Sequence, residues 1–165
     1  MLHVIATVTL AEGGFDTWSR AFAAVRPAVL AEDGCEAYEA TVEQPGVLGA
    51  QAAQLVAALG YPVLGWSRTA KSLPGVEGFS GDAGLATFLA RTRVLVNFLP
   101  LTDATRGIVD ARLLAGLPRG AFVVNPARGG HVVEADLLAA LDSGHIAGAM
   151  LDVFETEPLP ATHPF

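Results

Sequence analysis

The sequence predicts a doubly wound α/β fold with a mostly parallel sheet. Four short segments are almost wholly apolar, as strands buried on both faces of a parallel sheet are: residues 62–66, 94–99, 121–125 and 147–154. Four helical segments alternate with them, several opening on Asp or Glu and closing near Gly: residues 46–59, 82–90, 110–117 and 134–144. Such alternation is typical of doubly wound domains, in which helices cover a parallel sheet.

The first 43 residues have a different pattern. Residues 2–10 alternate between apolar and polar and are rich in β-branched side chains, which predicts a strand. Residues 15–31 place apolar side chains three or four apart, as one face of a helix does, and residues 35–42 alternate again. We therefore expect a β-α-β unit in residues 1–43 and a doubly wound part in residues 44–165, merged into one globular domain.

Composition excludes several classes of protein. The formal charge of −7 argues against a nucleic-acid partner, because a phosphate-binding surface would show as a basic patch. No apolar run approaches the roughly 20 residues of a membrane span, and no secretory signal is recognisable, so we expect a soluble, cytoplasmic protein without a membrane partner. The single cysteine, Cys35, excludes a cysteine metal cluster, and we expect no metal site.

A damaged glycine turn opens the doubly wound part. In the dinucleotide-binding pattern G-x-G-x-x-G, Gln44 stands at the first glycine, followed after Pro45 by Gly46, Val47, Leu48 and Gly49. Backbone N–H groups at such a helix start can hold a pyrophosphate, and small residues allow its close approach. The alternative is simply a tight helix start. Gln44 adds bulk where the turn should be tightest, so we expect weakened binding.

The residues that follow the second strand of this unit bear on the choice of cofactor. About 20 residues after the turn, a carboxylate would hold the ribose 2′-hydroxyl of NAD. The chain has Trp66, Ser67 and Arg68 there, with no acid. An arginine beside a hydroxyl suits a 2′-phosphate through charge-assisted hydrogen bonds, so NADP is favoured over NAD. The alternative is a solvated loop arginine.

Long motifs in residues 46–165 resemble a known family. The segments GWSRT, FLPLTDATRGIVDARLLAGLPRGAFVVNPARGGHVVEADLLAALDSG and GAMLDVFETEPLPATHPF are similar to the coenzyme domain of the D-2-hydroxyacid dehydrogenases, most closely of the glyoxylate/hydroxypyruvate reductase A type. The resemblance implies a Rossmann-like domain that binds NADP(H). It also implies that Leu99, Pro100 and Thr102 line the adenosine and pyrophosphate side, and that Thr105, another cofactor-binding residue, opens the next helix.

The same resemblance implies catalytic roles. Arg128 matches the arginine that grips the carboxylate and carbonyl of the substrate, for which a planar, two-pronged cation is suited. Asp152 matches the residue that contacts the nicotinamide carboxamide, and Glu157 matches the acid that orients a catalytic histidine. That histidine lies further on in the family, whereas His163 belongs to a motif expected to be structural. We expect proton delivery without it to be slower by about 100- to 10,000-fold.

Residues 1–43 resemble a second family. They are similar to the first β-α-β half of the antibiotic-biosynthesis or quinol monooxygenases, which have a ferredoxin-like fold. The two resemblances meet within residues 40–46, where residues 38–42 would supply the strand before the glycine turn. We interpret the chain as a chimera, either engineered, selected from fragments or produced by gene fusion; an engineered or selected chain agrees best with the preserved strand register.

Three hypotheses for function follow. The first is a residual NADP(H)-binding domain with little or no turnover, since the resemblance implies that a substrate domain and the catalytic histidine are absent. The second is an engineered or selected structural chimera with no ligand or activity, and the third is a weakly active NADPH-dependent 2-oxoacid reductase that works as a dimer. Because surface once covered by another domain would be exposed, and both families are commonly dimeric, we expect a homodimer.

Overall fold

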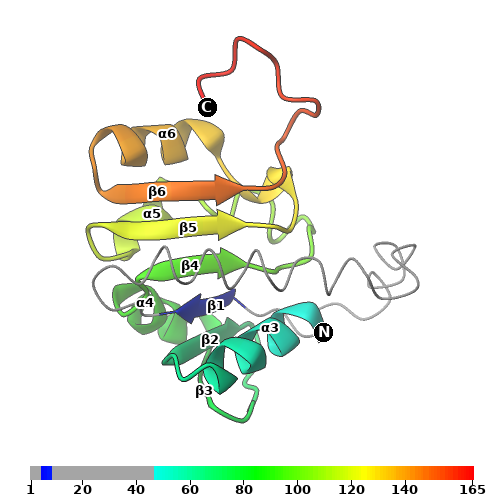
Figure 1. Ribbon diagram of the computed structural model, residues 1–165, viewed down its shortest axis with the longest axis vertical. Helices are drawn as coiled ribbons and strands as arrows, with labels where there is room; N and C mark the ends of the chain where they lie inside the picture. Colours follow the sequence, from blue (N-terminus) through cyan, green and yellow to red (C-terminus); the bar gives the residue numbers. More distant parts are fainter. Residues whose placement is uncertain (1–4, 9–46) are drawn as a thin grey trace.

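The computed structural model describes residues 5–8 and 47–165 of the chain. Figure 1 shows their single sheet, with the strand order β3-β2-β1-β4-β5-β6. The strands are β1 (Ile5–Val8), β2 (Val63–Ser67), β3 (Val76–Ser80), β4 (Val94–Asn97), β5 (Ala121–Asn125) and β6 (Ile146–Leu151). The helices are α3 (Val47–Ala58), α4 (Gly81–Ala90), α5 (Ala111–Gly116), α6 (Glu134–Asp142) and the short 3₁₀ helix η2 (Gly129–His131).

Helices pack on both faces of the sheet. On one face α4, α5 and α6 bury a large apolar core around Phe88, Leu95 and Leu137. On the other face, α3 packs against β1, β2 and β3, with Ala53 fully buried at its centre. Within residues 47–165 no helix is long and apolar enough to cross a membrane.

The doubly wound prediction is confirmed for most of residues 47–165. The four predicted helices and the four predicted strands of this part are all present. Strand β2 pairs parallel with β3, and β4, β5 and β6 pair parallel with one another. Every residue of β2 and β4 is buried, as a strand covered on both faces requires.

The centre of the sheet differs from the prediction. β1 lies between β2 and β4 and is antiparallel to both, with Ile5 opposite Trp66 on one side and Asn97 on the other. The sequence assigned this place to residues 38–42, which lie outside the described residues, as does the helix predicted for residues 15–31. The segment of β1, IATV, has no charged residue, whereas residues 38–42 contain Glu39, which is costly in a sheet centre.

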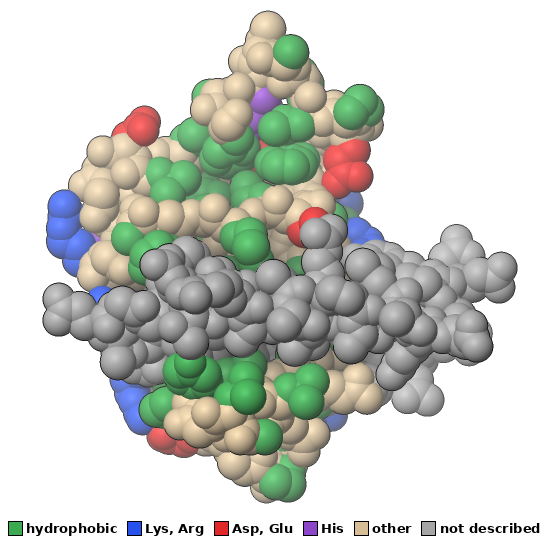
Figure 2. All heavy atoms as spheres, in the orientation of Figure 1, with side chains coloured by type: hydrophobic (Ala, Val, Ile, Leu, Met, Phe, Trp, Pro, Cys, Tyr) green, Lys and Arg blue, Asp and Glu red, His purple; other side chains and the backbone are tan. Residues whose placement is uncertain are grey.

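The two edge strands of the sheet show where burial patterns mislead. β3 was not predicted, since its sequence VEGFS has one charged residue and one glycine, and it pairs with β2 alone. β6 was predicted to be buried on both faces, but only Ile146 is buried and Met150 is exposed. Figure 2 shows hydrophobic side chains gathered on the face that carries α3. Exposed large hydrophobic residues include Leu48 and Leu55 of α3, Leu59 just after it, and Met150 of β6.

Candidate functional site

The candidate site lies at the edge of the sheet where the parallel strands end. Because β1 is antiparallel to both neighbours, β2 runs parallel to β4, and β2, β4, β5 and β6 end at one edge. Figure 1 shows that α3 begins at this same edge. Ligands of open α/β sheets bind outside the carboxyl ends of the strands, so this edge is the place to examine.

A cavity of about 330 Å³ lies between the end of β2 and the loop that follows β4. Its volume falls within the range of small-molecule sites, about 300–1,000 Å³. The residues that line it are Trp66, Arg68, Leu99, Thr102, Asp103, Ala104, Thr105 and Ile108. Five of these were predicted cofactor residues, and two loops distant in sequence bring them together. Asp103, Ala104 and Ile108 were not predicted, because they carry no recognisable cofactor pattern.

The β2 side of the cavity carries its single basic residue. Arg68 is exposed and makes no ion pair with another described residue. The indole of Trp66 is fixed, since its Nε1 donates to the carbonyl of Gly81 at 2.9 Å. The hydroxyl of Ser67 donates to the carbonyl of Thr69 at 2.7 Å, so in this conformation it can only accept from a ligand. The geometry therefore makes Arg68 the main candidate for binding a phosphate.

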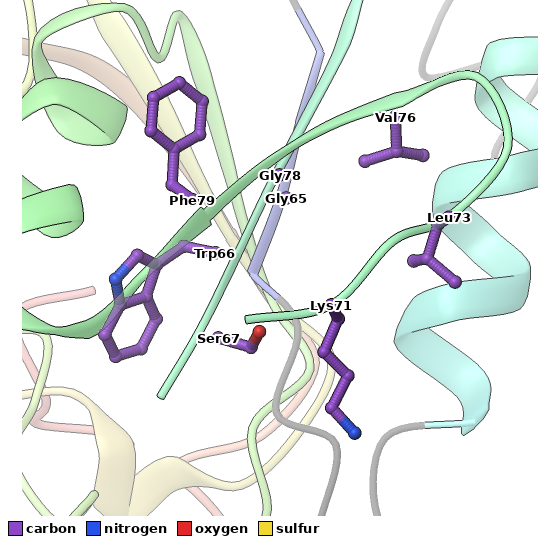
Figure 3. Close-up of a pocket in the computed structure, with 8 residues that line it drawn as sticks. All are labelled: Gly65, Trp66, Ser67, Lys71, Leu73, Val76, Gly78 and Phe79. Atoms are coloured by element: carbon purple, nitrogen blue, oxygen red, sulfur yellow. The ribbon is translucent and has the colours of Figure 1, made fainter. Parts of the chain in front are cut away.

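A second hollow, between β2 and β3, is much smaller. Its volume is about 10 Å³, roughly the space for one water molecule, so it cannot hold a cofactor. Figure 3 shows Trp66 and Phe79 on one side of these strands and Leu73 and Val76 on the other. Lys71 also lines this hollow, near Ser67, and adds a second exposed cation close to the end of β2.

The loop after β4 is a compact turn that Thr105 holds together. The Oγ1 of Thr105 accepts from the backbone N–H of Thr102 at 2.8 Å and donates to the carbonyl of Pro100 at 2.7 Å. The prediction that Thr105 opens a helix is wrong. The turn ends at Gly107, which has a φ of 62°, and α5 begins later with Asp110 as its N-cap. Thr105 instead shapes the wall of the cavity.

The strand ends are joined by two buried asparagines that the sequence did not single out. Nδ2 of Asn97 donates to Oδ1 of Asn125 at 2.9 Å, across the ends of β4 and β5. Oδ1 of Asn97 accepts from the backbone N–H of Leu99 at 3.0 Å. Nδ2 of Asn125 donates to the carbonyl of Arg128 at 2.9 Å. One network thus orients both the loop after β4 and the loop after β5.

The predicted catalytic residues lie on neighbouring loops. Arg128 follows β5, and its exposed guanidinium donates to the carbonyl of Ala127 at 2.7 Å. Glu157 follows β6, and its Oε1 accepts from the backbone N–H of Phe154 at 2.9 Å. The two loops touch, because a Cβ placed on Gly129 would lie 1.9 Å from the carbonyl carbon of Phe154. No hydrogen bond joins Glu157 to a described histidine.

Two other residues singled out in the sequence are placed by the structure. Asp152 directly follows β6 and is exposed, and its backbone N–H donates to the carbonyl of Asn125 at 3.2 Å. His163 forms a 3.0 Å hydrogen bond with Glu134, which ties the segment after β6 to the start of α6 and agrees with a structural role. Among the residues the structure describes, no group of three metal-ligating side chains is present.

The glycine turn is only partly within the described residues. Gly46 lies outside them, whereas Val47 is the first residue of α3. Leu48 is exposed and Gly49 is buried, as a small residue at a closely packed helix start should be. The amino end of α3 therefore offers backbone donors at the same edge as the cavity.

The fold and this edge define a Rossmann-like NAD(P)-binding domain. The chain belongs to the D-isomer specific 2-hydroxyacid dehydrogenases: the family model for their NAD binding domain matches residues 35–165. A second model, antibiotic biosynthesis monooxygenase, matches residues 1–49. Both resemblances seen in the sequence are thereby confirmed, and the two matches overlap at the predicted junction.

Curated relatives and solved structures agree with this assignment. The chain is 54% identical over 129 residues to glyoxylate/hydroxypyruvate reductase A of Salmonella choleraesuis, covering 78% of this chain and 41% of that protein's length. The D-isomer specific 2-hydroxyacid dehydrogenase of Xanthobacter autotrophicus, solved with NADPH and MES, is 56% identical, with a TM-score of 0.69 over 71% of this chain and 37% of that one. The NADPH-dependent glyoxylate/hydroxypyruvate reductase of Sinorhizobium meliloti, solved with NADP and sulfate, is 41% identical, with a TM-score of 0.70 over 86% and 52%.

Proposed function

We propose that this chain binds NADP(H) at the edge where β2, β4 and α3 meet. The observation that carries the proposal is the 330 Å³ cavity, in which Arg68 faces the loop from Leu99 to Thr105. The cavity is large enough for an adenosine moiety, and Arg68 supplies the cation that a 2′-phosphate requires. Similar structures have been solved with NADPH or NADP bound.

The charges and donors of the site favour NADP over NAD. In NAD-specific domains an acid at the end of the second strand accepts from the ribose 2′-hydroxyl, and would repel a 2′-phosphate. This position carries Ser67 and Arg68, with Lys71 close by. Asp103 lines the opposite wall of the cavity, so the phosphate would bind at the β2 side.

Titration with NADPH tests this proposal, with NADH as the matched comparison. We expect NADPH fluorescence to change on binding, with a dissociation constant weakened into the micromolar-to-millimolar range because the first glycine of the turn is missing. NADH should bind less tightly. No change at millimolar NADPH, together with a cooperative unfolding transition whose midpoint NADPH leaves unshifted, would favour the ligand-free structural chimera instead.

A second candidate function is the reduction of a 2-oxoacid, such as glyoxylate, which Arg128 favours. The exposed guanidinium can bind a carboxylate through two parallel hydrogen bonds and can polarise the adjacent carbonyl. Hydride would come from the cofactor, and a proton must reach the alkoxide oxygen. Because Glu157 is not paired with a described histidine, we expect slow turnover. NADPH oxidation with glyoxylate that disappears in Arg128→Ala would support this function, and a flat trace with folded protein would reject it.

Two further expectations stay predictions. The first is that the chain forms a homodimer. The second is that residues 1–43 and 44–165 together form one merged domain. Sedimentation would test the first. Limited proteolysis would test the second, because a protease should not cut a merged domain at the junction into stable fragments.

A further inference from the structure

His131 is a buried histidine directly behind the arginine loop. It is the last residue of η2, and its side chain is fully buried. Its Nδ1 lies 3.0 Å from the carbonyl oxygen of Arg128, and its backbone N–H also donates to that oxygen at 3.2 Å. The ring therefore contacts the main chain of the residue proposed to bind substrate.

The environment of the ring determines which nitrogen carries hydrogen. A carbonyl oxygen only accepts, so the Nδ1 that faces Arg128 must donate. Burial lowers the pKa of His131, and the guanidinium groups of Arg128 and Arg106 lower it further. The nearby carbonyls of Pro100 and Arg128 oppose this shift, although only the carbonyl of Arg128 is hydrogen-bonded to the ring. The neutral ring then has its hydrogen on Nδ1. Its Nε2 has no hydrogen-bond partner among the described residues.

Three donors converge on the carbonyl of Arg128. Besides the two from His131, Nδ2 of Asn125 donates to it at 2.9 Å. Oδ1 of Asn125 accepts in turn from Nδ2 of Asn97 and, at 3.3 Å, from the backbone N–H of Ala127. The peptide plane of Arg128 is therefore held from two sides, by the strand ends and by His131.

The hydrogen bonds from His131 and Asn125 to the Arg128 carbonyl form a clamp, and this clamp affects the side chain of Arg128. The guanidinium is exposed and contacts its own loop at the carbonyl of Ala127, so the backbone sets the direction in which it leaves the loop. A long, exposed side chain loses rotamer entropy when it binds a ligand, and a fixed backbone limits the additional ordering. Loosening the peptide plane would add to that loss.

We propose that His131 is a positioning residue: with its hydrogen on Nδ1, it holds the Arg128 carbonyl so that the guanidinium is presented to the carboxylate of a 2-oxoacid. The proposal rests on the function proposed above for Arg128. His131 touches neither substrate nor cofactor in this arrangement, and its effect passes through the main chain of Arg128.

Two substitutions separate the hydrogen bond from the volume of the ring. His131→Asn keeps an N–H donor near the place of Nδ1, whereas His131→Leu fills similar space without a donor. The probe is oxalate, a stable dianion shaped like a 2-oxoacid, titrated into the full chain saturated with NADPH, with Arg128→Ala as the reference. We expect His131→Leu to weaken oxalate binding about tenfold and His131→Asn about threefold or less, because only the former leaves the clamp without its side-chain donor.

NADPH affinity distinguishes a positioning role from a merely structural one, because a general loss of structure would weaken NADPH binding as well. It should change less than about twofold in both variants, since the cavity beside Arg68 does not include His131. Equal oxalate affinity in His131→Leu and the wild type would overturn the proposal, as would an equal loss of NADPH and oxalate binding. If His131→Leu does not fold, the oxalate affinity of His131→Asn and the tautomer of the wild-type His131 ring test the proposal.

The ring can be observed without any ligand. Nitrogen-15 NMR of the wild-type protein at pH 7.5 should show a neutral imidazole with hydrogen on Nδ1 and none on Nε2. The opposite tautomer would overturn this inference while leaving NADPH binding untouched. Absence of oxalate binding in the wild type, by contrast, would overturn the function proposed for Arg128 and this inference with it.

Discussion

Asn97 and Asn125 join the ends of β4 and β5 through a buried side-chain hydrogen bond of 2.9 Å. Each amide also bonds to the main chain of the loop that follows its own strand: Asn97 to Leu99, and Asn125 to Ala127 and Arg128. The loop that lines the cavity and the loop that carries the arginine are thus parts of one polar network. Changes in this network should reach both.

Asn97→Ala is expected to destabilise the protein by about 1–3 kcal/mol, because it leaves the buried N–H of Leu99 without its acceptor. Urea unfolding at neutral pH measures the effect. Ser143→Ala is the control: its exposed hydroxyl donates to Ala140 at the end of α6, and its loss should cost less than about 0.5 kcal/mol. Equal stabilities for the two variants would contradict the network's importance.

A matched pair of glycines tests the contact between the arginine loop and the segment after β6. Gly129→Ala places a Cβ 1.9 Å from the backbone of Phe154, which must move, so we expect a loss of about 2–3 kcal/mol or more. Gly84 lies in α4, where a Cβ meets Phe79 at an ordinary 3.5 Å, and Gly84→Ala should stabilise by about 0.5–1 kcal/mol. Thermal unfolding of both variants provides the comparison; a tolerated Gly129→Ala would show that the two loops separate freely.

Stability should fall as the pH falls below about 6.5, in part through His131. Burial lowers the pKa of its imidazole from the ordinary value near 6.5, so the unfolded chain takes up the proton first. Protonation therefore stabilises the unfolded state between pH 6.5 and the lower pKa of the folded protein, and stability is lost through that window. The unfolding free energy of His131→Asn should decline less steeply from pH 7 to 5, and parallel curves for the two proteins would refute the assignment.

Much of the fold of residues 47–165 could be predicted from sequence, because its strands are buried on both faces and therefore read as apolar runs. Residues 94–97 and 121–125 are examples. β3 escaped prediction because an edge strand has one neighbour and need not be apolar, as Glu77 and Gly78 show. The central strand could not be chosen by pattern, since residues 2–10 and 35–42 both alternate and pairing depends on contacts distant in sequence.

Residues of the candidate site could be proposed from the sequence where they belong to a continuous motif. Arg68 and Thr102 could be connected with a cofactor by motif, and the structure brings both to one cavity. The roles of Asn97, Asn125 and His131 could not be recognised, since an asparagine or histidine in a sequence does not reveal its burial or its partners. Thr105 lines the cavity, but the helix expected to begin there is a turn, because the segment that ends at Gly107 is held by a hydrogen bond back to Pro100.

Arg68→Ala should weaken NADPH binding about tenfold or more and leave NADH binding within about twofold, since it removes a charge-assisted contact to the 2′-phosphate alone. Arg93→Ala is the matched control, because Arg93 is also exposed but precedes β4 and so lies at the opposite edge of the sheet. Fluorescence titration of the three proteins with both cofactors gives the comparison. A similar loss for NADPH and NADH would contradict a phosphate contact.

The most direct test is a crystal structure of the chain with NADPH. We predict adenosine in the cavity beside Leu99 and Thr102, with the 2′-phosphate within about 3 Å of the Arg68 guanidinium. NADPH bound elsewhere, or an empty cavity in crystals grown at millimolar NADPH, would contradict it.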